Sequence, residues 1–306
     1  MNRILIIKHG AFGDVIQSDG ALRDIRAFHP GDEITVLTTK AYARIFERCP
    51  HIDRVMIDPR APRWRIDKML ALRQMLAKES FARVYDLQNS GRTAFYFQWL
   101  MPHVAWSGTA RGCSLPHKAP NPKKIRTLDR LAGQLADAGV PVRHSLKPDV
   151  SWMAQDMSAT IAAAGLQKPF IFLIPGSSAR HPQKRWPHYA ALAERLLARG
   201  FDVATAPGPD EHGPDLPGKV LRGPRGFLDW FELAGVMAEA HFVIGNDTGP
   251  THLAAHLGCR GLALYGSHMP AERTGILRDN FDAIQVDDVR SLSLERVSAE
   301  LTRHLS

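Results

Sequence analysis

The sequence predicts an α/β protein made of two similar domains, each with a parallel sheet. Strand-like apolar runs alternate with helical stretches in both halves of the 306-residue chain. Such alternation is typical of a parallel sheet with helices on both faces. A turn-rich break runs from Gly139 through Pro141 to Asp149. We therefore expect one domain over residues 1–150 and a second over residues 151–306.

Each element follows from its apolar run and the turn signals beside it. Ile4 to Ile7 form the first strand, and a glycine-bearing loop separates them from a helix that is expected to begin near Val15. Further strands of this half are expected at 34–37, 55–57, 84–87 and 103–106, and its helices at 15–28, 66–78, 91–100 and 125–139.

The second half repeats this alternation. Strands are expected at 170–174, 203–206, 241–244 and 261–265, and helices at 188–199, 227–239 and 251–257. A last helix over about 291–304 follows the final expected strand, and it is a candidate for packing back on the first domain.

Composition fits a soluble globular protein, with 44% hydrophobic and 23% charged residues. Cys49, Cys113 and Cys259 are far apart and form no C-x-x-C pair, which argues against a disulfide framework and a zinc site. No apolar run approaches the roughly 18 residues of a membrane span, and the N-terminal run is only a strand long. We therefore expect a cytoplasmic protein without a signal peptide or a membrane span.

Positive charge is concentrated in the first half. Residues 1–150 contain 24 Lys and Arg against 14 Asp and Glu, whereas the remainder contains 15 against 17. This charge favours an anionic partner, such as an anionic membrane surface or an acidic lipid head group, although a solvated basic face is the plainer alternative. Because no known nucleic-acid module is present, we expect no nucleic acid. The clustered basic residues are Arg60, Arg63, Arg65, Lys68, Arg73, Lys78, Arg83, Arg111, Lys118, Lys123, Lys124 and Arg126.

Two glycine-bearing turns follow strands and precede helices. In the turn from Gly245 to His252, the amides of Thr248 and Gly249 stand at a helix N-terminus, where a diphosphate would bind. Asp247 or Thr248 could instead cap this helix, with Pro250 near its first position. The N-terminal turn lacks G-x-G-x-x-G and G-K-[ST] spacing, which argues against a Rossmann dehydrogenase and a P-loop NTPase. It presents a carboxylate, Asp14.

Several motifs together resemble the lipopolysaccharide heptosyltransferase family. They lie in both halves and match that family in order and spacing: Lys8, Gly13 to Ile16, Ala21, Leu22 and Arg26, then Pro175 to Ser178, Lys184 to Pro187, Gly208 to Glu211, Asn246 to Ala255, and Tyr265 with Gly266. The resemblance implies a GT-B fold, with two Rossmann-like domains whose parallel sheets face a central cleft. It also implies that the first domain handles the acceptor, that the second binds a nucleotide-sugar donor, and that transfer inverts the anomeric centre without a metal.

Inverting transfer needs a base for the acceptor hydroxyl and electrophilic help for the departing diphosphate. Asp14 is the expected base, as in the family, and capping of the helix near Val15 is the structural alternative. Lys184 matches the family's phosphate-side lysine, and would otherwise be one more solvated lysine. Ser177 and Ser178 offer hydroxyls to the diphosphate or merely close a turn.

The remaining donor contacts also come from the resemblance. Glu211 matches the family glutamate that binds the donor ribose, or else is a solvated loop acid. Asp247 is expected to accept hydrogen bonds from hydroxyl groups of the transferred sugar. His252 matches the family's helix motif; it forms an i, i+4 pair with His256, but no H-E-x-x-H glutamate accompanies them, so we expect a packing or hydrogen-bonding role and no metal.

The expected function is therefore inverting transfer of a sugar, which the resemblance favours as heptose from ADP-heptose, to a lipopolysaccharide core or related anionic, lipid-linked glycan. Peripheral contact with the inner membrane surface would accompany such an acceptor. The segment from Ile16 to Gly20 departs from the family pattern, which puts the acceptor in doubt more than the fold. A nucleotide-sugar epimerase or hydrolase of the same plan, and a noncatalytic nucleotide- or glycan-binding protein, remain alternatives.

Overall fold

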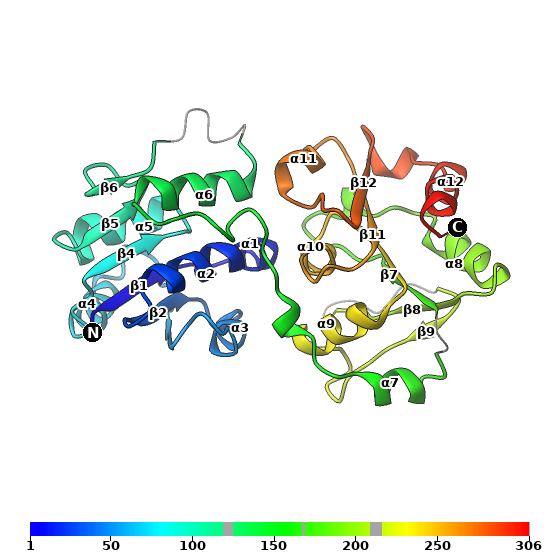
Figure 1. Ribbon diagram of the computed structural model, residues 1–306, viewed down its shortest axis with the longest axis horizontal. Helices are drawn as coiled ribbons and strands as arrows, with labels where there is room; N and C mark the ends of the chain where they lie inside the picture. The colour runs from blue at the N-terminus through cyan, green and yellow to red at the C-terminus, as the bar shows by residue number, and fades with distance from the viewer. Residues whose placement is uncertain (119–124, 167–168, 209–215, 306) are drawn as a thin grey trace. The chain divides into compact units, whose positions relative to one another are not determined.

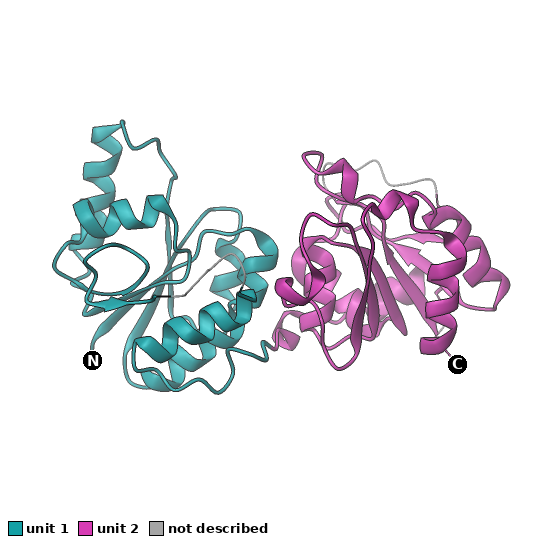
Figure 2. Cartoon of the chain, turned by 90° about the horizontal axis from the view of Figure 1, so that it is seen from above, with its two compact units in different colours: residues 1–148 teal, residues 149–306 magenta. Residues whose placement is uncertain are grey.

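The computed structural model of the chain describes residues 1–118, 125–166, 169–208 and 216–305. The chain divides into two compact units, Met1–Pro148 and Asp149–Ser306, which Figure 2 shows in teal and magenta. Each unit contains a six-stranded sheet, and every strand pair in both sheets is parallel. The α/β fold class predicted from the sequence is confirmed.

Unit 1 is the blue-to-green half of Figure 1. Its strands are β1 (Arg3–Ile7), β2 (Glu33–Thr38), β3 (Arg54–Ile57), β4 (Arg83–Asp86), β5 (Ala105–Gly108) and β6 (Leu115–Pro116), in the spatial order β3-β2-β1-β4-β5-β6. Its helices are α1 (Phe12–Gln17), α2 (Asp19–Phe28), α3 (Ala43–Glu47), α4 (Ile66–Ala77), α5 (Gly91–Phe95), the π-helix η1 (Tyr96–Leu100) and α6 (Thr127–Asp137).

Unit 2 repeats this plan. Its strands are β7 (Phe170–Ile174), β8 (Asp202–Thr205), β9 (Lys219–Val220), β10 (Phe242–Asn246), β11 (Gly261–Tyr265) and β12 (Phe281–Gln285), in the order β12-β11-β10-β7-β8-β9. Its helical segments are η2 (Ser151–Met153), α7 (Ser158–Ala163), η3 (Pro182–Lys184), α8 (Tyr189–Ala198), α9 (Trp230–Glu239), α10 (Gly249–His256), α11 (Ala271–Thr274), η4 (Val289–Ser291) and α12 (Leu294–Leu305).

Both sheets have the doubly wound strand order of dinucleotide-binding folds. The order reverses between β1 and β4 in unit 1 and between β7 and β10 in unit 2. Ligands of such folds bind outside the carboxyl ends of the strands at this switch point. The strands on either side of each reversal are almost wholly buried, because helices cover both faces of the sheet, and this explains their near-continuous apolar sequences.

Several elements differ from the sequence prediction. The expected helix over 15–28 is two helices that meet at Ser18, whose hydroxyl donates to the carbonyl of Val15 (2.7 Å). Strand β12 is absent from the prediction because it lies at the edge of the sheet, where only Phe281 and Ile284 are buried, and this gives no apolar run. The last helix, α12, lies beside α8 (Figure 1) and places Val297 and Leu301 in the core of unit 2. Among the described residues, no helix is both long and apolar enough to cross a bilayer.

Candidate functional site

Polar side chains gather at the switch point of unit 1, where β1 and β4 end. Lys8 follows β1, and its ammonium group donates to the carbonyl of Leu87 (3.3 Å). Burial lowers the pKa of Lys8, although the carboxylates of Asp14 and Asp86 act in the opposite direction. Gly13, the other residue expected in this loop, lies in the first turn of α1. Lys8 is thus a buried lysine whose ammonium group is held by the carbonyl of Leu87.

Asp14 also lies in the first turn of α1, which begins at Phe12 with Ala11 as its N-cap. The predicted helix start near Val15 is therefore wrong, because the turn ends earlier, and Asp14 is not the capping residue. The carboxylate is half-buried and has no hydrogen bond or ion pair to any described part of the chain. Burial and the charge of Asp14 both raise the pKa of the Tyr42 hydroxyl. Asp14 remains available to a ligand.

Asp86 ends β4 and is 1% exposed. Burial raises its pKa to about 6, although hydrogen bonds from Thr93, Asn89 and Gln88 and the charge of Lys8 work against this. The unfolded value is near 3.9. The folded protein therefore keeps a proton that the unfolded chain releases, so stability falls as pH rises from about 4 to about 6.

We expect Asp86→Asn to remove this loss of stability. The wild type should lose up to about 3 kcal/mol from this one group between pH 4 and pH 7, since each pKa unit is worth about 1.4 kcal/mol. Urea denaturation of both proteins across this range measures the difference. If the free energy of unfolding changed with pH in the same way in both proteins, the Asp86 carboxylate would be ionised in the folded protein without any loss of stability, which would contradict this expectation.

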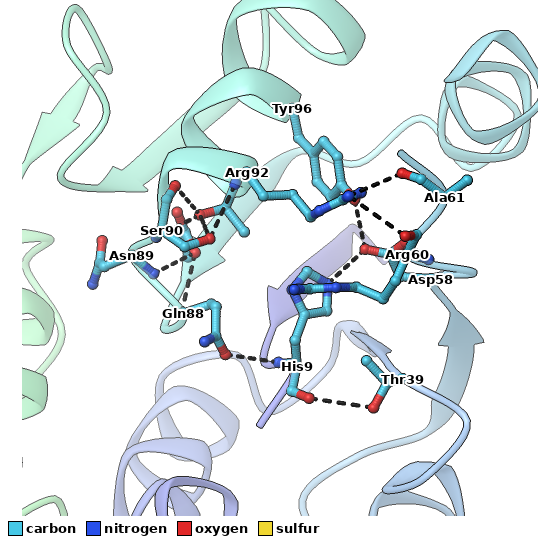
Figure 3. A network of polar contacts seen from close by, with 12 residues as sticks. His9, Thr39, Asp58, Arg60, Ala61, Gln88, Asn89, Ser90, Arg92 and Tyr96 are labelled. Carbon is cyan, nitrogen blue, oxygen red and sulfur yellow. Dashed lines mark hydrogen bonds and ion pairs between the residues drawn. The ribbon is translucent and has the colours of Figure 1, made fainter. Parts of the chain in front are cut away.

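A buried hydrogen-bond network lies beside this switch point (Figure 3). Asp58 Oδ2 lies 2.9 Å from His9 Nε2 and accepts a hydrogen bond from the Tyr96 hydroxyl (2.6 Å). Arg60 Nη1 lies 3.0 Å from His9 Nδ1. Because a guanidinium only donates, Nδ1 must accept, which leaves the proton on Nε2, facing Asp58. Burial favours a higher pKa for Asp58, but these bonds from His9 and Tyr96 hold it below its ordinary value.

Two arginines connect this network to the surface. Arg92 donates to the Tyr96 hydroxyl (3.0 Å) and to the carbonyl of Ala61 (2.9 Å). Arg60 is exposed and Arg92 is half-buried. Two guanidinium groups held in this way suit an anionic ligand. Sequence reasoning counted Arg60 only for its charge and missed Arg92, which is a lone basic residue after the N-cap Ser90.

The corresponding switch point of unit 2 is centred on Asp247. Its Oδ2 accepts a hydrogen bond from Lys184 Nζ (2.7 Å) and lies 2.6 Å from His268 Nε2. Its Oδ1 lies 3.7 Å from His252 Nε2. Burial alone would raise the pKa of Asp247, but hydrogen bonds and charge from His252 and Lys184 hold it well below its usual range. Loops after β7 and β11 and helix α10 thus bring basic groups to one carboxylate.

Helix α10 begins next to this cluster. Thr248 is its N-cap residue, but the Thr248 side chain bonds to none of the first-turn amides. Asp247 turns toward Lys184, so neither of the two capping alternatives is seen. Gly249 and Pro250 form the first turn. Amides at a helix N-terminus without a side-chain cap are suited to an anion.

Two serines expected at the diphosphate differ in position. Ser177 is buried, and its hydroxyl donates to the carbonyl of His181 (3.0 Å) and accepts from Arg185 Nε (3.1 Å). Ser178 is exposed and accepts from the amide of Arg180 (3.3 Å). Both hydroxyls thus hold the loop after β7. Glu211, expected at the donor ribose, lies outside the described residues.

Asn246 fastens the loops of unit 2 to each other. Its Nδ2 donates to the carbonyl of Pro175 (2.8 Å), and its Oδ1 accepts from the amide of Trp186 (3.2 Å). The end of β10 therefore fixes the segment that carries Lys184. Sequence reasoning gave no role to Asn246 or His268, although Asn246 ends the buried strand β10 and His268 follows the buried strand β11.

The histidines of α10 have separate partners. His252 faces Asp247, whereas His256 Nδ1 accepts a hydrogen bond from Arg278 (2.7 Å). Burial and the Arg278 charge lower the pKa of His256. In the part of the chain that the structure describes, no three His, Cys, Asp or Glu side chains are grouped to hold a metal.

Both units are doubly wound. One switch point presents the Asp14 carboxylate, and at the other the N-terminus of α10 lies beside basic side chains. This is the architecture of GT-B glycosyltransferases. The sequence model of glycosyltransferase family 9 (heptosyltransferase) matches residues 69–302. The chain therefore belongs to this family, and the resemblance seen in its motifs is confirmed.

Named relatives agree with this assignment. A lipooligosaccharide heptosyltransferase 2 of Haemophilus influenzae is 25% identical, over 99% of this chain and 94% of the relative. The solved structure of E. coli ADP-heptose lps heptosyltransferase II has a TM-score of 0.76 at 21% identity, covering 100% of this chain and 98% of that one. E. coli heptosyltransferase WaaC with ADP-2-deoxy-2-fluoro heptose has a TM-score of 0.74 at 19% identity, covering 98% and 99%. At these identities the two structures show a shared fold.

Proposed function

We propose that this protein transfers heptose from ADP-heptose to a lipopolysaccharide core or related anionic glycan, with inversion at the anomeric carbon. The observation that carries the proposal is the Lys184–Asp247 ion pair beside the free N-terminus of α10, in a chain of the heptosyltransferase family. Relatives named for ADP-heptose and lipopolysaccharide support this donor and acceptor. The enzyme would act in the cytoplasm, at the inner face of the membrane.

Unit 2 is the proposed donor side. Lys184 and the first amides of α10, at Thr248 and Gly249, would bind the diphosphate and stabilise its charge as it leaves. Pro250 pre-sets the first turn of this helix. Asp247 would hold Lys184 in place and, having lone pairs to spare, accept a hydroxyl of the transferred sugar.

Four further donor-binding residues have supporting roles in this proposal. His252 and Ser177 would orient Asp247 and the loop that precedes Lys184, whereas Ser178 is exposed enough to reach a phosphate oxygen. Glu211 would bind the ribose hydroxyls, as the family resemblance implies.

Unit 1 is the proposed acceptor side. The Asp14 carboxylate would take the proton of the acceptor hydroxyl while that oxygen attacks the anomeric carbon. The bond from this carbon to the diphosphate oxygen breaks, and ADP leaves with the electron pair. Lys8 and Gly13 would support the Asp14 turn, and Arg60 and Arg92 would bind anionic groups of the acceptor.

No metal is part of this proposal. Lys184 and His268 converge on Asp247, and Arg185 lies in the same loop as Lys184. Basic side chains and helix amides together supply the positive charge that a leaving diphosphate requires.

Thermal stability with nucleotides tests the donor assignment. ADP with a chelator present should raise the melting temperature by several degrees, since a ligand at 100 times its Kd adds about 2.7 kcal/mol to native-state stability. UDP, GDP and NAD should have smaller effects at equal concentration. A shift with UDP or GDP only would change the donor, and a shift with NAD alone would contradict the proposal.

A further inference from the structure

Unit 1 has a surface on which large apolar side chains are exposed among basic ones. Trp64 is 75% exposed, Ile66 69% and Trp99 64%. We call this surface the basic-aromatic patch. It consists of Arg63, Trp64, Arg65, Ile66, Leu70, Arg73, Phe95 and Trp99.

Ring contacts join two separate segments into this one surface. The Arg63 guanidinium lies over the ring of Phe95, 5.8 Å from its centroid. Phe95 in turn stacks on Trp99, with centroids 6.4 Å apart. The segment before α4 and the helices α5 and η1 therefore meet at Phe95.

Helix α4 extends the patch. Its residues Met69, Leu72 and Leu76 are buried in the core of unit 1. Ile66 and Leu70 are one turn apart on another face and are exposed. Helix α4 thus carries exposed apolar side chains in addition to those that it contributes to the core of unit 1.

The charge of the patch is strongly positive. Residues 60–73 contain five Arg or Lys and one acidic residue, Asp67. Asp67 pairs with Arg65, with Nη2 and Oδ2 3.0 Å apart. The other four basic residues remain as net positive charge around Trp64.

We propose that the basic-aromatic patch binds the surface of an anionic phospholipid bilayer. Tryptophan favours the interface between head groups and acyl chains, and Lys and Arg are attracted to anionic lipids while their apolar stems lie along the hydrocarbon boundary. Interfaces between proteins are also enriched in Trp and Arg, but their cores are depleted in charged residues overall. Residues 60–73 instead keep a net positive charge around Trp64, which an anionic lipid surface complements.

The basic-aromatic patch lies close in sequence to residues of the proposed acceptor side. It directly follows the segment from Asp58 to Ala61, which carries Arg60 and contacts Arg92. Membrane contact would hold these residues near a lipid-linked acceptor. This use rests on the proposed function, whereas binding to lipid does not.

The test measures co-sedimentation of the full-length protein with vesicles that contain no acceptor. Vesicles of phosphatidylcholine alone are compared with vesicles that also contain phosphatidylglycerol. We expect binding to the anionic vesicles only, weakening as salt screens the charges. Arg63→Gln with Arg73→Gln should lower the partition coefficient at least about tenfold, as expected from roughly 1 kcal/mol for each basic residue near the surface. Trp64→Ser with Trp99→Ser should also lower it at least about tenfold, because this variant removes the two largest apolar side chains that would lie in the membrane interface.

A matched control lies in unit 2. Leu197 is exposed there, and Arg199 lies over the ring of Phe201, so Leu197→Ser with Arg199→Gln removes the same kinds of side chain and should leave vesicle binding unchanged. The ADP-induced thermal shift shows that each variant is folded and separates a failure of lipid binding from a failure of the proposed function. Equal binding of wild type and patch variants, or no binding to anionic vesicles, would overturn the proposal. A third result would also overturn it: the wild type does not bind vesicles but associates with itself, and the tryptophan variant does not self-associate. A second copy of the chain would then cover the patch.

Discussion

Asp14→Asn should lower the rate of sugar transfer by about 10²–10⁴-fold, the usual contribution of a positioned general base. The amide has nearly the same size as the carboxylate but cannot take the proton of the acceptor hydroxyl. Asp14 has no hydrogen bond to lose among the described residues, and Ala11 is the N-cap of α1. The loss should therefore appear in kcat, with the ADP-induced thermal shift unchanged.

The control for Asp14 is Glu47→Gln, which removes an exposed carboxylate from another short helix of unit 1, α3. This variant should keep full activity. Wild-type kcat in Asp14→Asn would remove Asp14 from the mechanism. A large fall in thermal stability would instead assign Asp14 to the fold.

Lys184→Met should weaken ADP binding by about 10- to 100-fold, because a charge-assisted hydrogen bond to phosphate is worth about 1.5–3 kcal/mol. The same change leaves the buried Asp247 carboxylate without its lysine partner, so stability should also fall. Isothermal titration with ADP measures the first effect, and urea denaturation measures the second.

A double variant separates these two effects. Adding Asp247→Asn to Lys184→Met removes the unpaired charge and should restore most of the stability, while ADP affinity stays low. Arg180→Met, an exposed residue of the same loop, should change neither property. Unaltered ADP affinity in Lys184→Met would sink the assignment of Lys184 to the diphosphate.

The central strands could be predicted because burial on both faces gives uninterrupted apolar runs. The predicted strand at 170–174 coincides with β7. Edge strands could not be predicted in this way. In β12 only Phe281 and Ile284 are fully buried, and β6 and β9 are two residues long, so their sequences carry little signal.

Candidate site residues were predictable where they follow a strand within a motif, as Asp14 and Asp247 do. The contacts that these residues make with distant side chains were not predictable. Lys184 meets Asp247 across 63 residues, and His268 reaches the same carboxylate from the loop after β11. These contacts depend on which strands become neighbours in the sheet, a non-local property that no local pattern encodes. The packing of Tyr96 against Asp58, which positions Arg92, is likewise non-local.

The most direct test of the account is a transfer assay with purified protein, ADP-heptose, a chelator and a lipopolysaccharide core acceptor. The account predicts that ADP is released only when acceptor is present, and that NMR of the product shows an anomeric configuration opposite to that of the donor. Consumption of ADP-heptose without acceptor would indicate an epimerase or hydrolase. Retention of configuration, or activity that the chelator abolishes, would contradict the proposed mechanism.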